Sequence, residues 1–236
     1  MQTILLVAAE AKELRGILRR CQRPERLGWP LRFSRAGELA GQRLLMVADG
    51  PGRELALGAL RLALGRQRVD AVVSTGWCGA LEPDFAPGEI FVASRVEAAG
   101  EHMSYTAGIP RTGQKARSGC LVTVDRVVRT IEHKVRLRQA GAAAVDMEAA
   151  AVASEARAAG IPFFCVRVVL DLAGEDLRLD LEAARDRQGR FSRGRILRAA
   201  LARPRLLIPE LIRLERRSRL AARALGDFVA ECRFEP

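Results

Sequence analysis

Aromatic residues are scarce in this sequence: Phe, Trp and Tyr together make up 5% of its 236 residues. The scarcity matters because the chain is strongly basic, with 39 Lys and Arg against 28 Asp and Glu and a net charge of +11, a balance that usually points to an anionic partner. Nucleic-acid-binding proteins place aromatic side chains among their basic residues to stack on bases. In the most basic stretch, residues 187–223, twelve arginines stand against two glutamates, and Phe191 is the one aromatic residue. Nucleic acid is therefore disfavoured as a partner.

Cysteine and histidine are too few and too scattered for a disulfide framework or a zinc site. The five cysteines are an odd number with no C-x-x-C pair, and there are two histidines. A chain of 236 residues can bury a sufficient hydrophobic core without such reinforcement. Neither a disulfide framework nor a zinc site is therefore expected.

Long apolar runs are also missing. The run at residues 4–9 lacks a basic start and leads directly into Glu10 and Glu13, which predicts a core strand rather than a signal peptide. A membrane-spanning helix needs roughly 18 apolar residues, and no segment supplies them. A cytoplasmic protein is expected, with contact to a membrane surface as an open alternative.

Short apolar runs do recur, and helix-like segments rich in Ala, Leu and Arg lie between them. The predicted strands are 4–9, 44–48, 71–74, 90–93, 121–124 and 163–170; the predicted helices are 11–20, 54–66, 127–140 and 148–159. Continuous apolar runs are typical of strands buried on both faces, and their alternation with helices predicts a three-layer α/β fold with a central, twisted, mostly parallel sheet flanked by helices. No repeat or linker divides the chain, so residues 1–236 are expected to form a single domain.

The C-terminal segment has a different character. Apolar residues recur at helical spacing between Leu207 and Phe228 with arginines on the other faces, which predicts a basic amphipathic helix at about 205–230. We expect this helix to pack on the core with its arginines in solvent; the alternative is an interfacial helix on an anionic membrane. The composition of residues 175–200 does not distinguish a flap over a site from a disordered connection.

Three loops follow predicted strands, at the edge where α/β sheets bind ligands. The first contains Gly50 and Gly52 and opens a helix, a geometry suited to an anion or a hydroxyl. The second contains Gly76, Trp77 and Cys78, where small residues permit close approach to the backbone. Each of the two is also compatible with a purely structural turn.

The third loop gathers acidic residues. Asp146, Met147 and Glu148 open a helix, and the strand that contains Arg167 ends at Asp171. Two or three carboxylates therefore meet at strand ends, although acids at a helix start often serve only as caps, worth under about 1 kcal/mol.

The order of several motifs along the chain is informative: VAAEAKEL, DGPGREL, STGWCGAL, GCLVTVDRVV, VDMEAAAVA and VRVVLD. This order resembles the nucleoside phosphorylase superfamily, specifically its hydrolytic branch, the 5′-methylthioadenosine/S-adenosylhomocysteine nucleosidases. The resemblance implies a sheet closed into a partial barrel, a homodimer and a purine nucleosidase that acts on an adenosine-type nucleoside. Because this chemistry needs only water and carboxylates, the resemblance implies no metal ion or redox cofactor.

The resemblance also implies roles for the carboxylates. Asp171 is the expected acid that protonates the departing base, which requires burial to raise its pKa. Glu13 is expected to position and deprotonate a water, with Glu10 as the alternative, and Glu148 is expected to bind the ribose hydroxyls.

Other residues are expected to shape the substrate site. Met147 packs against the sugar, Val127 and Val128 line the base, and Arg167 supports the acidic cluster or forms an ordinary buried ion pair. The remaining substrate-site candidates are Asp146, Gly76, Trp77 and Cys78.

Three positions depart from the nucleosidase pattern. Trp77 and Leu170 stand where these enzymes have serine, and aliphatic Val127 replaces an aromatic residue. The pocket is therefore expected to be more apolar. Together with the Arg-rich helix, this suggests as an alternative the hopanoid-associated nucleosidases, which remove adenine from an adenosyl-lipid at the membrane surface.

Two further alternatives concern the reaction. Phosphorolytic relatives need a cationic phosphate site, including an arginine soon after the first strand, where this chain has Glu10, Lys12 and Glu13. Water is therefore the favoured nucleophile. Phosphate stays an alternative nucleophile because Arg53 lies beside the first glycine loop. A non-catalytic nucleoside-binding protein is disfavoured, because binding alone does not require three acids at these separate places.

Overall fold

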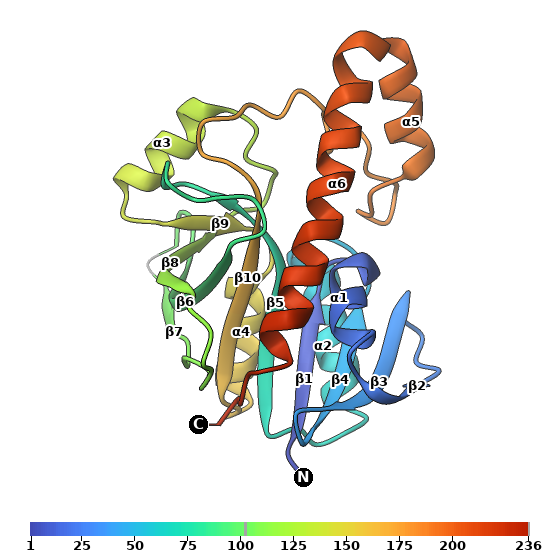
Figure 1. The fold of residues 1–236 in the computed structure, drawn as a ribbon, viewed down its shortest axis with the longest axis vertical. Helices are drawn as coiled ribbons and strands as arrows, with labels where there is room; N and C mark the ends of the chain where they lie inside the picture. The colour runs from blue at the N-terminus through green and yellow to red at the C-terminus, as the bar shows by residue number, and fades with distance from the viewer. Residues whose placement is uncertain (102, 236) are drawn as a thin grey trace.

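The computed structural model describes residues 1–101 and 103–235. Within them, strands and helices alternate along the chain as the sequence predicts (Figure 1). The strands are β1 (Thr3–Ala8), β2 (Gln22–Arg26), β3 (Phe33–Leu39), β4 (Gln42–Ala48), β5 (Ala71–Ala80), β6 (Ile90–Ala98), β7 (Ser104–Thr106), β8 (Arg117–Thr123), β9 (Ala144–Asp146) and β10 (Phe163–Asp171). The helices are α1 (Ala11–Leu18), α2 (Arg53–Leu64), α3 (Ile131–Gln139), α4 (Ala149–Ala158), α5 (Arg193–Ala202) and α6 (Pro204–Val229).

All strands belong to one sheet, in the order β10-β6-β8-β9-β5-β1-β4-β3-β2, with β7 added beside β6. Strand β10 also pairs with β5, so the five strands from β10 to β5 close into a barrel, while the other strands extend it as an open sheet. The α/β class is confirmed, and so is the barrel closure. The sheet is mixed rather than mostly parallel, because five of its ten pairings are antiparallel.

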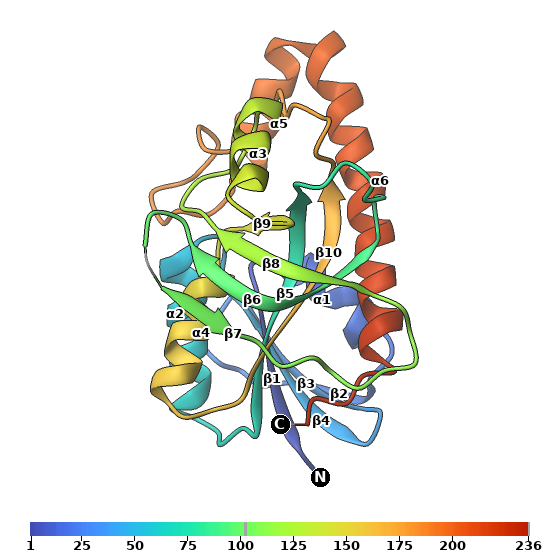
Figure 2. The ribbon, with the colours of Figure 1, turned by 90° about the vertical axis from the view of Figure 1, so that its left-hand side faces the viewer.

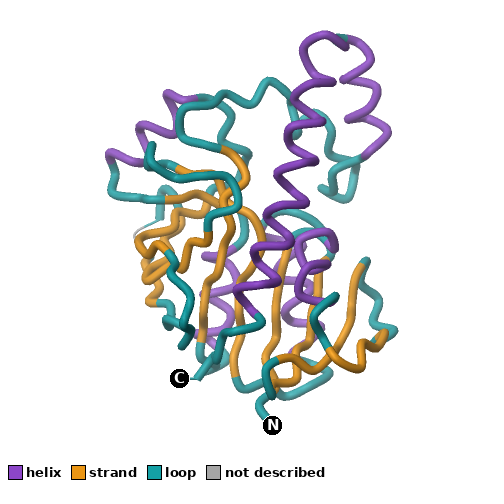
Figure 3. The backbone as a smooth tube through the Cα atoms, viewed as in Figure 1, coloured by secondary structure: helices purple, strands orange, loops and turns teal. Residues whose placement is uncertain are grey.

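Helices cover both faces of the sheet and make three layers (Figures 2 and 3). The apolar side chains of α2 and α4 pack with one face of β1, β4 and β5 in one core cluster. Those of α1 and α6 pack on the opposite face in a second cluster. The central strands are buried on both faces, which explains their continuous apolar sequences.

The amphipathic C-terminal helix is α6. Its C-terminal half packs on the sheet beside α1, and its N-terminal half leaves the sheet and forms a hairpin with α5 at one end of the molecule (Figure 1). Residues 175–192 are ordered by polar contacts: the Glu210 carboxylate accepts hydrogen bonds from the backbone N–H groups of Arg178 and Leu179, and Glu175 forms an ion pair with Arg217.

Several elements carry no clear signal in the sequence. Strand β2 is exposed along its whole length, β7 and β9 have three residues each, and α5 was not expected. Helix α3 begins at Ile131 rather than at residue 127, because the Thr130 hydroxyl accepts a hydrogen bond from the N–H of His133 and caps the helix there.

Candidate active site

Four acidic side chains lie where strands end. Glu13 is in the first turn of α1 after β1, Asp146 ends β9, Glu148 precedes α4, and Asp171 ends β10. All four are buried. Because β1, β5 and β10 run parallel, Glu13 and Asp171 lie at the same edge of the sheet, on either side of the C-terminal part of β5.

Glu13 is held against β5. Its carboxylate accepts hydrogen bonds from the N–H of Trp77 at 3.1 Å and from that of Glu10 at 2.8 Å. Gly76 permits this approach: it has a φ of +131°, and a Cβ there would lie 2.9 Å from the carboxyl carbon of Glu13. Burial raises the pKa of Glu13, although backbone hydrogen bonds and the charge of Arg167 oppose the shift.

Glu10, the alternative water ligand, is placed differently. Its carboxylate is partly exposed and lies 3.4 Å from the ammonium group of Lys12. Glu13, by contrast, is 4% exposed and faces the strand. Of the two glutamates, Glu13 therefore has the buried position that the expected role requires.

Glu148 connects the acidic loop to the glycine loop. Its Oε1 accepts a hydrogen bond from the N–H of Gly52 at 2.7 Å, so the helix-opening glycine loop binds a carboxylate of the protein itself. Burial, with the nearby negative charge of Asp146, raises the pKa of Glu148 to about 7. Glu13 also raises this pKa, which places both carboxylates in one electrostatic cluster.

Asp146 and Arg167 form a fully buried ion pair beneath this cluster. Asp146 also accepts hydrogen bonds from the hydroxyl of Thr123 at 2.6 Å and from the N–H of Ala149 at 2.8 Å. The Arg167 guanidinium donates to the carbonyl of Thr75 and to the hydroxyl of Ser74. The side chains of this pair are 0% and 1% exposed, so both contact other protein groups rather than solvent.

Asp171 lies further along β5, against Gly79. A Cβ on Gly79 would lie 3.1 Å from Oδ2 of Asp171, so glycine again permits close approach of a carboxylate. Burial raises the pKa of Asp171, and the ammonium group of Lys134, 2.6 Å from Oδ2, opposes the shift. Sequence reasoning missed Lys134, because a lone lysine on a polar helix gives no signal of burial.

Gly76 and Gly79 are three residues apart on β5, which corresponds to roughly 10 Å along a strand. The Glu13 and Glu148 cluster therefore lies at one end of a short stretch of backbone and Asp171 at the other. The two acids thus approach β5 at separate points along its length, Glu13 at Gly76 and Asp171 at Gly79.

The other predicted residues surround these acids. Val128 is buried in a small apolar cluster, and half-buried Met147 packs against the same cluster. Half-buried Val127 donates its N–H to Glu182, and Cys78 is buried in the core, where desolvation raises its pKa well above the usual value. Trp77 is half-buried against the α1 and α6 core.

The first glycine loop offers little free cationic charge. Gly50 lies in the positive-φ region, and Arg190 donates to the carbonyl of the preceding Asp49 at 2.8 Å. Arg53 points to Glu101, at 3.1 Å. In the part of the chain that the structure describes, no group of three His, Cys, Asp or Glu side chains is placed to hold a metal ion.

Comparison with known proteins finds relatives of this chain and of its fold. A 5′-methylthioadenosine/S-adenosylhomocysteine nucleosidase from Listeria monocytogenes is 26% identical over 178 residues, covering 62% of this chain and 76% of the relative. A putative nucleosidase of the same name from Borrelia burgdorferi, solved bound to adenine, superimposes with a TM-score of 0.72 at 15% identity over 97% of this chain and 98% of that one. The Neisseria meningitidis enzyme, solved with methylthio-immucillin-A, has a TM-score of 0.66 at 18% identity over 97% and 100% of the two chains.

The closed barrel with helices on both faces and buried acids at its strand ends defines an α/β protein of the nucleoside phosphorylase type. The model of the phosphorylase superfamily matches residues 23–202. The chain belongs to that superfamily, and the resemblance recognised from its sequence motifs is confirmed.

Proposed function

We propose that this protein is a nucleosidase that hydrolyses the N-glycosidic bond of an adenosine-type nucleoside to a free base and a ribosyl product. The observation that carries the proposal is the set of three buried carboxylates: Glu13 and Asp171 lie against β5, and Glu148 lies close enough to Glu13 for the two charges to interact. The similarity to proteins named as nucleosidases, one of them solved with adenine, supports the choice of substrate class.

In this mechanism Asp171 is the general acid. Its buried carboxyl retains a proton more readily than an exposed one, because burial raises its pKa. As the bond between the sugar C1′ and the base nitrogen breaks, the electron pair stays with the base, and Asp171 gives its proton to another ring nitrogen of the base. The base departs neutral, and C1′ acquires oxocarbenium character.

Glu13 and Glu148 act on the sugar side. Glu13 accepts a proton from the water whose oxygen bonds to C1′. Glu148 binds the ribose hydroxyls, and its ionised form places negative charge close to the developing cation. Met147 and the Val127 and Val128 pair supply the apolar walls, while Asp146 and Arg167 hold the acidic loop in place.

Water is favoured over phosphate as the nucleophile. The N–H of Gly52 already donates to Glu148, and Arg53 is engaged with Glu101. Two buried glutamates at the sugar end also repel a phosphate dianion. Phosphate-dependent turnover would reverse this assignment.

The test is base release, followed by chromatography, from methylthioadenosine, adenosylhomocysteine, inosine and a 5′-alkyl-adenosine, each with and without phosphate. We expect adenine without phosphate from wild type and none from Asp171→Asn, with nucleoside binding retained. Asp176→Asn, on the exposed loop nearby, keeps an oxygen that can accept the hydrogen bond from the N–H of Ile131; it is the matched control and should keep its activity. Binding without turnover in wild type would identify a non-catalytic nucleoside-binding protein instead.

The α5–α6 hairpin favours a second candidate, a lipid-linked adenosyl substrate reached at an anionic membrane. Its inner side is apolar, with Ala200 and Leu207 buried together. The residues that directly follow inner ones are exposed instead: Leu197 (58%), Leu201 (62%), Ile208 (38%) and Ile212 (49%). In each helix, the exposed residue comes directly after an inner one and therefore points about 100° around the helix axis from the inner side. Because α5 and α6 run in opposite directions (Figure 1), these rotations bring all four exposed residues to the same side of the hairpin.

The same hairpin also carries many arginines. Among the described residues, no acidic side chain forms an ion pair with six of them: 193, 195, 198, 203, 205 and 216. An apolar face bordered by free arginines is complementary to an anionic lipid surface. No helix within residues 1–101 and 103–235 is long and apolar enough to span a bilayer, so the contact proposed is peripheral.

Vesicle flotation tests this candidate with phosphatidylcholine vesicles that contain or lack phosphatidylserine. We expect binding that requires phosphatidylserine, falls with salt and is lost when Leu197 and Leu201 are both replaced by Asn. Ile109→Asn, at an exposed position outside the hairpin, is the control. A preference for long 5′-alkyl groups would support the lipid-linked substrate, and no salt-sensitive binding would refute the membrane contact.

The homodimer implied by the family resemblance also belongs to this proposal. Analytical ultracentrifugation should give twice the mass of one chain. If the variant with Leu197 and Leu201 replaced by Asn is a monomer and the wild-type protein does not bind vesicles, the exposed face of the hairpin binds a second copy of the chain rather than lipid. A cytoplasmic location remains a prediction from the sequence.

A further inference from the structure

One charged side chain beside the candidate acid has no place in the mechanism so far. Lys134 is the one fully buried residue of α3, with 1% of its surface exposed, although the rest of that helix is polar or partly exposed. Burying an ammonium group is costly unless it is paired and hydrogen-bonded. Its burial therefore requires a specific set of partners.

Those partners are all close to Asp171. The Nζ atom of Lys134 lies 2.6 Å from Oδ2 of Asp171, 2.6 Å from the carbonyl oxygen of Leu172 and 3.0 Å from that of Glu175. An ammonium group has three N–H donors, so these three acceptors use all of them. Lys134 thus holds both the carboxylate and the backbone of the loop that follows β10.

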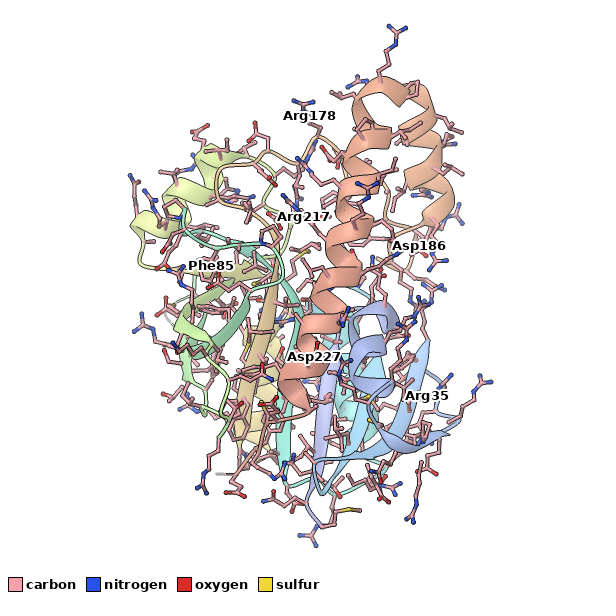
Figure 4. All side chains as sticks on the ribbon, in the orientation of Figure 1. Arg35, Phe85, Arg178, Asp186, Arg217 and Asp227 are labelled. Atoms are coloured by element: carbon pink, nitrogen blue, oxygen red, sulfur yellow. The ribbon has the colours of Figure 1, made fainter. Side chains whose placement is uncertain are left out.

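A second ion pair continues this connection to α6. The Glu175 carboxylate receives two hydrogen bonds from Arg217, at 2.6 and 2.9 Å, and Arg213 lies 4.0 Å away. Figure 4 shows Arg217 on the side of α6 that faces this loop. At the start of α3, Asp176 accepts a hydrogen bond from the N–H of Ile131 at 2.7 Å.

We propose that Lys134 is a positioning residue for Asp171: it fixes the carboxylate against β5 and sets how readily that carboxylate takes up the proton that it later gives to the base. This inference rests on the proposed nucleosidase function. The charged groups that face Asp171 are Lys134 from α3, Glu175 from its own loop and Arg217 from α6.

The direction of the effect follows from these charges. Burial is the largest influence on Asp171 and raises its pKa, whereas the cation of Lys134 lowers it. An acid catalyst must be protonated, so activity falls as pH rises through this pKa. Removing the Lys134 charge should raise the pKa and move the alkaline limb of the pH profile upward by about one to three pH units, the usual effect of a close opposite charge.

The test compares Lys134→Gln, which removes the charge and keeps N–H donors for the loop carbonyls, with Lys134→Arg, which keeps the charge. We expect the alkaline limb of kcat/KM to move upward in Lys134→Gln and to stay near the wild-type position in Lys134→Arg. Asp176→Ala is the control for loosening the contact between α3 and the loop, and it should lower activity equally at every pH. A Lys134→Gln profile parallel to that of Asp176→Ala would overturn the proposal.

A readout that needs no turnover separates this inference from the proposed function. The carboxyl ¹³C signal of Asp171, assigned as the one lost in Asp171→Asn, can be titrated by NMR. An upward shift of its midpoint in Lys134→Gln supports the positioning role even if no nucleoside in the panel is cleaved, and an unchanged midpoint refutes it even if base is released. If Lys134→Gln does not fold, Lys134→Met, which removes the charge and keeps an unbranched side chain for the buried position, is titrated instead: a raised midpoint supports the role of the charge, and an unchanged midpoint refutes it.

Discussion

Replacing Arg167 with Met should destabilise the protein strongly, because Arg167 is the cation of its most deeply buried ion pair. The side chain of Arg167 is 1% exposed and that of Asp146 is 0% exposed. Removing one partner of such a pair costs roughly 3–5 kcal/mol, since a charge is left buried without its counterion. Asp146 retains the hydroxyl of Thr123 and the N–H of Ala149, which places the expected cost near the lower end, about 3 kcal/mol.

Urea unfolding followed by tryptophan fluorescence measures this cost. A loss of about 3 kcal/mol is a large share of the 5–15 kcal/mol typical of a whole domain, so the midpoint should fall clearly. Arg61→Met, which breaks the exposed pair with Glu155, is the matched control and should leave the midpoint unchanged.

The double variant Arg167→Met with Asp146→Leu tests the reason for the loss. With both charges gone, no unpaired ion remains buried, so we expect the double variant to recover part of the stability lost by Arg167→Met. A loss below about 1 kcal/mol in Arg167→Met would refute the view that this ion pair supports the acidic loop.

Three more predictions address close backbone approaches and the pH dependence. Gly76→Ala should lower kcat and cost roughly 1–3 kcal/mol in urea unfolding, because a Cβ at φ +131° would lie 2.9 Å from the carboxyl carbon of Glu13. Gly16→Ala should lower the melting temperature, because a Cβ there would lie 1.7 Å from the carbonyl oxygen of Ala222 on α6. Gly58→Ala is the control: a Cβ at this position in α2 meets open space, and the melting temperature should rise because alanine favours a helix more than glycine does. Folding raises the pKa of Glu148 from 4.5 to about 7, so the contribution of Glu148 to stability is present below pH 4.5 and is lost as pH rises through 7. Glu148→Gln should remove this decline in the free energy of unfolding, which amounts to about 3 kcal/mol at most. An unchanged pH dependence of unfolding in Glu148→Gln would contradict the assignment.

The sequence was sufficient for features that depend on local pattern. Continuous apolar runs predicted the central strands, because a strand covered by helices on both faces is apolar at every position. The stripe between Leu207 and Phe228 predicted α6 for the same kind of reason, since helical spacing alone determines which side chains share a face. Strand β2, exposed and polar throughout, has no such pattern and was missed.

The candidate acids were also recognisable, because motif order places them directly after strands. The motifs did not determine which of these acidic side chains lie close together in the folded protein or which residues hold them in place. The choice between Glu10 and Glu13 depends on Gly76, whose missing Cβ lets one carboxylate reach β5 across 63 residues of sequence. The support from Arg167 depends on the pairing of β10 with β5.

Sequence alone thus determined the α/β class, the superfamily motifs and the acidic residues, since each follows from residue types at short spacing. Tertiary structure alone decided which strands close the barrel, with β10 paired to both β5 and β6, the burial of Lys134 beside Asp171 and the exposed apolar face of the α5–α6 hairpin. These features arise from contacts between distant segments, whose free energy depends on what each side chain meets after folding. A lysine at position 134 looks like any solvent-facing residue until the loop after β10 surrounds its ammonium group with three oxygen atoms.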